Sequence, residues 1–268
     1  MLRLLVLLLA GTWSSVPHAE RVVTLSPHAT ELVWFAGGGD QLVGVSAFSD
    51  YPQPVRKLPV IGDSTGIDRE RLMSLHPDLL VYWSRGIKPS DLAWLEKRGI
   101  ATFASNPVTI DGLIDEIRRL GELLGTTKTA EEHIATIERK REQLAGLGDG
   151  KRIRMIHQLW NRPFIVLGRQ DLLPHALALC GIDNPVEIGE LASASVSLEY
   201  LHAIDADAIL ISDDALFEPF NPRGLPVYRG DSSRLHRATP RLLDAALEVC
   251  TQIRSGKPRD TSRTTRDE

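Results

Sequence analysis

Residues 70–82 read ERLMSLHPDLLVY and residues 199–211 read EYLHAIDADAILI, so one pattern occurs twice in the chain. Each copy has a glutamate, a leucine two residues later, an aspartate and then an apolar run. The pattern predicts a short amphipathic helix, a turn and a buried strand. The strand does not alternate between polar and apolar residues, which is typical of a parallel sheet with helices on both faces. The repeat therefore predicts two similar α/β lobes.

The segments upstream of each copy predict the same start for both lobes. Residues 21–25 predict a strand, and Ser26 opens a helix that ends before Gly37. In the second lobe, residues 151–159 predict a strand and residues 172–179 a helix. Alternation of strands and helices predicts parallel sheets, so the expected fold class is α/β with two Rossmann-like lobes.

A long helix is predicted between the lobes. Its sequence is charged except for Ile134, Ile137, Leu144 and Leu147, which predicts a helix that bridges the lobes through solvent and holds them at a nearly fixed distance. The expected domains are a signal peptide over residues 1–19, an N-terminal lobe over 20–125, the interdomain helix over 126–150, a C-terminal lobe over 151–254 and a disordered tail over 255–268.

The N-terminus predicts export. Arg3 is followed by an apolar run over residues 4–10 and by small residues that end at Ala19, which is the pattern of a cleavable signal peptide. The run is too short to cross a bilayer. The alternative is an ordinary apolar N-terminal helix. We expect an exported, periplasmic protein.

Composition excludes several functions. The 268 residues are 43% hydrophobic, which is enough for a folded core, and the net charge of −4 argues against nucleic-acid binding. No zinc-type motif is present, so we expect no metal site and no cofactor. After export, Cys180 and Cys250 most simply form one disulfide, and the alternative is two buried thiols.

Ordered motifs along residues 21–253 resemble one family. They are RVVTLSPHATEL (21–32), VGVSAFSDYP (43–52), ERLMSLHPDL (70–79) and RATPR (237–241). In this order they resemble the periplasmic cobalamin-binding proteins that supply ATP-driven importers. The resemblance implies the fold of a class III periplasmic binding protein, no enzymatic activity, a monomer, and delivery of a corrinoid to an ABC permease dimer with its ATPase. It also implies the Cys180–Cys250 disulfide.

The resemblance implies a set of cargo-binding residues in a cleft between the lobes. A corrin is a large, mostly apolar disc with amide arms, and aromatic faces with a few polar groups suit it. Trp160 and Asn161 follow the first strand of the second lobe and are expected to face the same cleft. The other predicted ligand-binding residues are Phe48, Tyr51, Ser64, Trp83, Asp231 and Arg237.

Some positions depart from the family. Ser64 and Ser193 stand where cobalamin-binding members carry tryptophan. Asp63 stands where haem-binding members carry a ligand tyrosine, which weighs against haem. The simplest positions for His28 and His236 are helix caps or the surface, and the alternative is that they reach a metal in the cargo.

Glu70 and Glu199 occupy equivalent places in the two copies of the repeat. In the family such glutamates contact arginines on the two permease subunits, so we expect them to dock the protein on the permease. Charge complementarity with a helix N-terminus is the alternative explanation.

Three other functions are compatible with the sequence. The cargo of the same fold could be haem or a ferric siderophore, or the protein could be a sensor that reports cargo to another protein. The third is a secreted serine hydrolase, because residues 62–66 read GDSTG with Ser64 as nucleophile. That motif requires a strand before it and a helix directly after it, and the sequence predicts neither.

Overall fold

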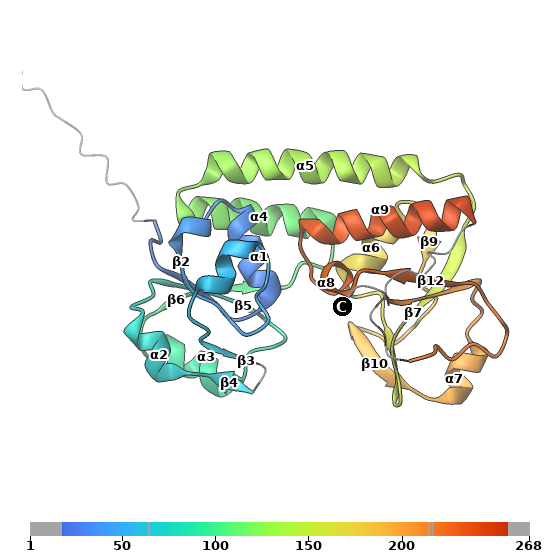
Figure 1. The fold of residues 1–268 in the computed structure, drawn as a ribbon, viewed down its shortest axis with the longest axis horizontal. Coiled ribbons are helices and arrows are strands. Elements are labelled where there is room, and N and C mark those ends of the chain that lie inside the picture. Colours follow the sequence, from blue (N-terminus) through green and yellow to red (C-terminus); the bar gives the residue numbers. More distant parts are fainter. Residues whose placement is uncertain (1–17, 64, 214, 216, 257–268) are drawn as a thin grey trace, which may run out of the picture.

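The computed structural model describes residues 18–63, 65–213, 215 and 217–256. Two lobes lie side by side beneath a layer of helices (Figure 1). Residues 1–17 of the predicted signal peptide and residues 257–268 of the predicted tail lie outside the described residues. Within the described ranges, no helix has both the length and the apolar character that crossing a bilayer requires.

Lobe one is built on a four-stranded parallel sheet with the strand order β2-β1-β5-β6. All of β1 is buried, and β5 is buried along its first four residues, because neither strand has a solvent face. A two-stranded antiparallel ribbon, β3-β4, extends from the lobe. The elements are β1 (Val22–Thr24), α1 (Pro27–Phe35), β2 (Leu42–Gly44), β3 (Gly62–Asp63), β4 (Gly66–Ile67), α2 (Arg69–Ser74), β5 (Leu79–Trp83), α3 (Pro89–Glu96) and β6 (Ala101–Ser105), with short 3₁₀ turns at Gly39–Gln41 and Gln53–Lys57.

Lobe two has the strand order β10-β8-β7-β11-β12, and β9 also pairs with β7. Strands β7, β11 and β12 pair in parallel, as predicted. Strand β8 pairs antiparallel with both of its neighbours, β7 and β10, so the sheet is mixed. The reason is local: β7 continues directly into β8 through the short turn at Arg162-Pro163, and a hairpin forces antiparallel pairing. The elements are β7 (Ile153–Asn161), β8 (Phe164–Leu167), α6 (Leu172–Ala178), β9 (Ile182–Asp183), β10 (Ser193–Val196), α7 (Leu198–Ala203), β11 (Ala208–Ser212), β12 (Val227–Gly230), α8 (Ser232–Leu235) and α9 (Pro240–Ser255).

The sequence repeat forms the same unit in both lobes. Its helices are α2 and α7, and its strands, β5 and β11, each pair in parallel with the first strand of their lobe. The aspartate of the repeat accepts the same kind of backbone hydrogen bond in both lobes. Asp78 accepts hydrogen bonds from the backbone N–H of Glu20 (2.9 Å) and Arg21 (3.1 Å), and Asp207 accepts one from the N–H of Arg154 (2.8 Å). Each aspartate therefore fixes the entry of its lobe's first strand.

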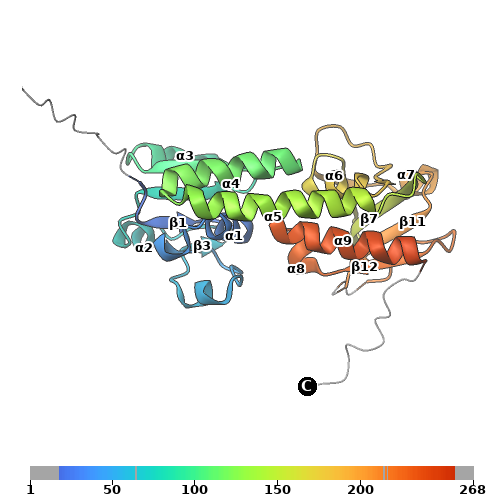
Figure 2. The same ribbon diagram turned by 90° about the horizontal axis from the view of Figure 1, so that it is seen from above.

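Helices α4 (Ile110–Leu124) and α5 (Thr127–Gly146) form an antiparallel pair that turns at Gly125, whose φ of 69° is left-handed. Figure 2 shows α5 running along α4 over lobe one and along α9 over lobe two. Its buried residues, Ala130, Ile134, Ile137 and Leu144, belong to the main hydrophobic core. The expectation of a helix that bridges through solvent is therefore wrong in this respect. The outer face of α5 is charged, but its apolar face packs on the helices beneath it.

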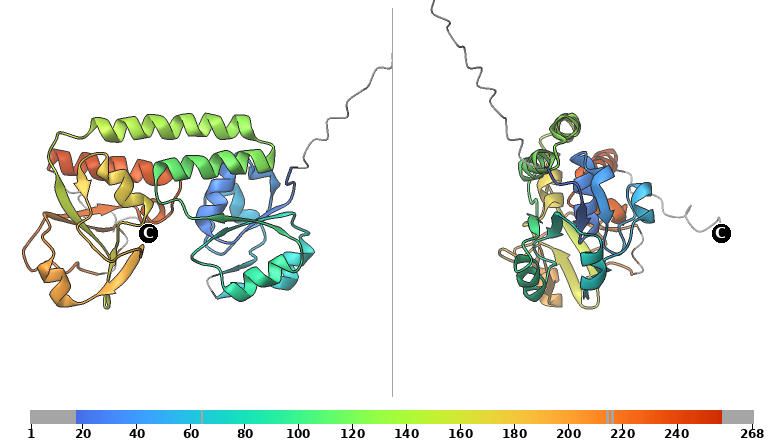
Figure 3. Two further views of the ribbon diagram at one scale, coloured as in Figure 1. Left: turned by 180° about the vertical axis from the view of Figure 1, so that it is seen from behind. Right: turned by 90° about the vertical axis from the view of Figure 1, so that its left-hand side faces the viewer.

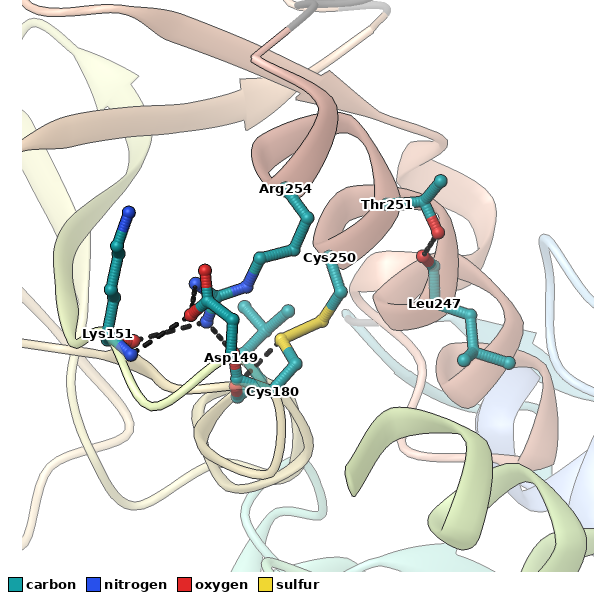
Figure 4. Close-up of a disulfide and its surroundings, with 8 residues drawn as sticks. Asp149, Lys151, Cys180, Leu247, Cys250, Thr251 and Arg254 are labelled. Atoms are coloured by element: carbon teal, nitrogen blue, oxygen red, sulfur yellow. Dashed lines mark hydrogen bonds and ion pairs between the residues drawn. A yellow bond between two sulfur atoms is a disulfide. The ribbon is translucent and has the colours of Figure 1, made fainter. Parts of the chain in front are cut away.

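Both sheets lie on one side of α5 (Figure 3). The predicted disulfide is confirmed: Cys180, which follows α6, is bonded to Cys250 in α9, and both residues are fully buried. Arg254 reinforces the same junction by pairing with Asp149 and donating to the carbonyl oxygen of Cys180 (Figure 4). Helix α9, which ends at Ser255, takes in the first residue of the predicted tail.

Candidate functional site

A cleft of about 590 Å³ lies between the lobes. Both lobes contribute to its walls, and most of the wall residues follow the carboxyl ends of strands, where open α/β sheets bind their ligands. In lobe one these are residues 26–28 after β1, Trp83 at the end of β5 and residues 106–108 after β6. In lobe two they are residues 232, 233 and 236–238, which follow β12.

Trp83, one of the predicted ligand-binding residues, is the aromatic side chain that lobe one contributes to the cleft lining. It is the last residue of β5 and remains 41% exposed, while the four residues before it are buried. Its Nε1 donates a hydrogen bond to Oδ1 of Asn106 (3.2 Å), and its ring stands perpendicular to the ring of His28 with centroids 6.2 Å apart. The indole is therefore held in one orientation but keeps apolar surface for a ligand.

His28 lies at the start of α1 and lines the same wall. Its Nδ1 is 3.2 Å from Oγ of Ser26, and its Nε2 is buried and has no hydrogen-bond partner. Burial, assisted by the charge of Arg237, lowers the pKa of His28 to about 4. The side chain is therefore a neutral imidazole at neutral pH.

Arg237, one of the predicted ligand-binding residues, is an arginine that lobe two contributes to the cleft lining. Its Nη1 is 2.6 Å from Oδ1 of Asp50, and its Nη2 donates to the carbonyl oxygen of Phe48 (3.2 Å). Burial opposes ionisation of Asp50, but the bonds to Arg237 lower its pKa overall. The cleft thus contains an ion pair that joins the two lobes.

Lobe two also contributes His236 and Asp171 to the cleft lining. Nε2 of His236 is 2.7 Å from Oγ of Ser212, and its ring stacks on that of His157 at 5.4 Å. Burial lowers the pKa of His157 and raises the pKa of Asp171. Of the two histidines that the sequence suggested for a cargo metal, only His28 keeps an unpartnered Nε2.

The other predicted binding residues lie away from the cleft lining. Phe48 is 83% exposed beside the cleft, with a left-handed backbone (φ 64°), and Trp160 is 51% exposed in lobe two next to Phe217. Tyr51 packs between Phe35 and the guanidinium of Arg241. Asp231 caps α8 and pairs with Arg234, Asn161 ends β7 at the hairpin, and Ser64 lies outside the described residues.

Sequence reasoning missed several residues that line the cleft. Asn106, Pro107 and Val108 follow β6, and Arg85 lies just beyond β5 and donates to the carbonyl oxygen of Gln170 in lobe two (3.5 Å). The rule that ligands bind at strand carboxyl ends would have identified residues 106–108 once β6 was recognised. The same rule applies to Arg85, two residues after β5, whereas Asp171 carries no such signal in the sequence.

Glu70 and Glu199 lie in α2 and α7, which occupy the ends of the two lobes that face away from α5 (Figure 1). Both residues are exposed. Hydrogen bonds at the N-terminus of α7 lower the pKa of Glu199. The structure places the pair at equivalent points of the two lobes, outside the cleft.

The described residues lack the features of a metal centre and of a serine hydrolase active site. They contain no cluster of three or more metal-ligating side chains. The segment that follows residue 64 forms β4 and not a helix, and α2 begins only at Arg69. The strand–turn–helix geometry that a hydrolase nucleophile at Ser64 would need is therefore absent from the described residues around it.

Comparison with known proteins shows similarity to periplasmic binding proteins. The profile of the family described as "Periplasmic binding protein" matches residues 22–225. The chain is 30% identical over 247 residues to the vitamin B12-binding protein of Vibrio cholerae, which covers 88% of this chain and 90% of that protein. The vitamin B12-binding protein of Yersinia pestis is 31% identical over 247 residues, which covers 88% of this chain and 87% of that protein.

Solved structures agree. The crystal structure of the periplasmic vitamin B12-binding protein BtuF of Vibrio cholerae superposes with a TM-score of 0.79 and 30% identity, covering 89% of this chain and 99% of the other. A periplasmic haem-binding protein from Pseudomonas aeruginosa superposes with a TM-score of 0.73 at 23% identity, covering 90% of this chain and 95% of the other. The second likeness concerns the fold alone.

Proposed function

Because the chain belongs to the periplasmic binding protein family, we propose that it captures cobalamin or a related corrinoid between its lobes and delivers it to an ABC importer. The observation that carries this proposal is the cleft itself, to which lobe one contributes Trp83 and lobe two contributes Arg237. The similarity to vitamin B12-binding proteins over nearly the whole chain supports the choice of ligand.

The chemistry of the cleft suits such a cargo. The exposed face of Trp83 offers an apolar surface on which a flat macrocycle can stack. Around it are groups that hydrogen-bond without adding net charge: neutral His28, the amide of Asn106 and the hydroxyls of Ser232 and Ser233. Amide arms are the natural partners of these groups. In this reading Phe48 and Trp160 contact the cargo from the rim.

The protein binds and releases its cargo without changing it. Its relatives are solute-binding proteins, and the cobalt of the corrinoid belongs to the cargo, so no cofactor is needed. The N-terminal residues 1–19 act as a signal peptide that sends the chain to the periplasm. There the protein works as a monomer that docks on the permease dimer, with its ATPase, through Glu70 on one lobe and Glu199 on the other.

Titration calorimetry of the purified mature protein tests the ligand. Cyanocobalamin, haemin and a ferric siderophore are titrated separately under the same conditions. We expect saturable one-to-one binding of cyanocobalamin, and a much weaker response to the other two. Tight binding of haemin or of the siderophore without binding of cyanocobalamin would replace the corrinoid by that cargo. Ester hydrolysis by the purified protein would contradict the binding function altogether.

A further inference from the structure

A buried carboxylate of lobe one holds the segment of lobe two that leads into α9. Glu31 lies in α1, and its side chain is 0% exposed. Its Oε1 accepts from Nη1 of Arg237 (2.9 Å) and from Nη1 of Arg241 (2.8 Å), and its Oε2 accepts from Oγ1 of Thr239 (2.8 Å). A charge buried this deeply requires such partners, because each missing one would leave it without solvation.

Asp50 completes the arrangement, because its Oδ1 lies 2.6 Å from the same Nη1 of Arg237. Two carboxylates therefore face two guanidinium groups, and the set carries no net charge. We call Glu31, Asp50, Arg237 and Arg241 the Glu31 cluster. It stands at the side of the cleft, and Asp50 and Arg237 belong to the cleft lining.

Arg237 still has hydrogen-bond donors for a ligand. A guanidinium side chain carries five N–H groups, and the bonds to Glu31, Asp50 and the carbonyl of Phe48 use three of them. The remaining two belong to a side chain that is 15% exposed at the cleft. These donors suit an acceptor that brings no charge, because the positive charge of Arg237 is already balanced.

A carboxylate on the cargo would meet a different situation. It would bring a third negative charge to a cluster that has only two positive ones, and Glu31 is too deeply buried to be screened by solvent. Discrimination by an unfavourable charge is a common source of specificity, because it penalises the wrong ligand more than it rewards the right one.

On the basis of the proposed function, we infer that the Glu31 cluster is a specificity device: it selects corrinoids whose side arms are amides over corrinoids in which an arm is a carboxylate. Glu31 and Asp50 act as positioning and charge-balancing residues for Arg237, which makes the contact. The same device disfavours other macrocycles that carry carboxylate arms.

The test compares two ligands of nearly equal size. Cyanocobalamin is titrated against the separated monocarboxylic acids that form when one propionamide arm is hydrolysed. The quantity measured is the ratio of the Kd of the acid to the Kd of cyanocobalamin. For at least one isomer, this ratio should exceed about five in the wild type and should fall by about fivefold in Glu31→Gln, since one balancing charge is removed.

Asp50→Asn provides a second variant that is expected to fold, because the Asp50 side chain is 45% exposed, and its ratio should fall in the same direction. Glu248→Gln is the matched control. It removes a carboxylate that pairs with an arginine of lobe two, Arg234, but touches no member of the Glu31 cluster, so its ratio should equal that of the wild type.

The outcomes separate the two proposals. If Glu31 serves structure alone, Glu31→Gln and Asp50→Asn weaken both ligands equally and leave the ratio unchanged, which overturns the specificity inference while the corrinoid function stands. A wild-type ratio near one for every isomer overturns it as well. If the wild type binds no corrinoid, the proposed function fails and the inference fails with it.

Discussion

Removing the indole of Trp83 should weaken corrinoid binding by a factor that follows from its exposed area. A tryptophan side chain presents about 250 Å² at most, and Trp83 is 41% exposed, so about 100 Å² remains for a ligand to cover. At about 25 cal/mol per Å², this area is worth about 2.5 kcal/mol of binding free energy. Trp83→Ala should therefore raise the Kd for cyanocobalamin roughly sixtyfold.

Titration calorimetry at 25 °C measures this change in Kd, and two further variants test whether it comes from the ring of Trp83. Trp94→Ala removes an equally large ring that lies against Arg69 and Arg98 away from the cleft, so it should lower stability but leave the Kd unchanged. In Gly86→Ala the new Cβ would lie 2.6 Å from the ring of Trp83, so the indole must shift although it is still present. This variant should weaken binding by an intermediate factor. A change of less than about threefold in Trp83→Ala would refute the stacking argument.

Four further predictions concern docking, stability and motion. Glu70→Arg combined with Glu199→Arg should abolish corrinoid uptake in cells that depend on this protein while leaving the Kd unchanged, and a parallel loss of affinity would mean that the two residues serve the cleft or the core. Replacing Cys180 and Cys250 by alanine should lower the free energy of unfolding in urea by about 4 kcal/mol, because the disulfide closes a loop of 70 residues; an unchanged urea midpoint would contradict this. The pKa of His28 is lowered to about 4 in the folded state, so the unfolded chain binds the proton more readily and stability falls between pH 6.5 and pH 4. Over that range the wild type should lose about 3 kcal/mol more than His28→Asn in urea unfolding, and equal losses would show that His28 is not buried as described. Small-angle scattering of free and cargo-bound protein should show little compaction, since α5 packs on α4 in one lobe and on α9 in the other, and a large decrease in the radius of gyration would show that the lobes hinge freely.

Most of the fold could be predicted because its signals are local. The repeat predicted α2 with β5 and α7 with β11, and the structure confirms both pairs at equivalent places. Helix α5 and the disulfide were also predicted. The antiparallel strands β8 and β10 were not, because the sequence of β8 has the same apolar character as a parallel strand, and its direction depends on a turn of two residues after β7.

The site was less accessible to prediction, because a side chain's direction at the end of a strand is a property of the assembled lobe. Trp83 and Arg237 line the cleft as expected. Tyr51 comes from the same family motif as Phe48, yet its ring is covered by Arg241, a residue from the other lobe. No pattern within residues 43–52 could show that contact.

The Glu31 cluster shows which part of such a site can be predicted from the sequence. Glu31 is the one acid in helix α1, whose residues 28–33 are all buried, and an acid in that setting requires a buried cation or several hydrogen bonds. The requirement can be read from the sequence, but the identity of the partner cannot, because Arg237 follows 206 residues later in the other lobe. Two arginines occur within five residues there, and only the structure shows that Arg241 turns to Tyr51 while Arg237 faces the cleft. An acid in a buried helix next to a strand end is therefore a useful marker of a contact between lobes. In this chain the buried Glu31 needs a cationic partner, and that partner, Arg237, is the group that we expect to select the cargo.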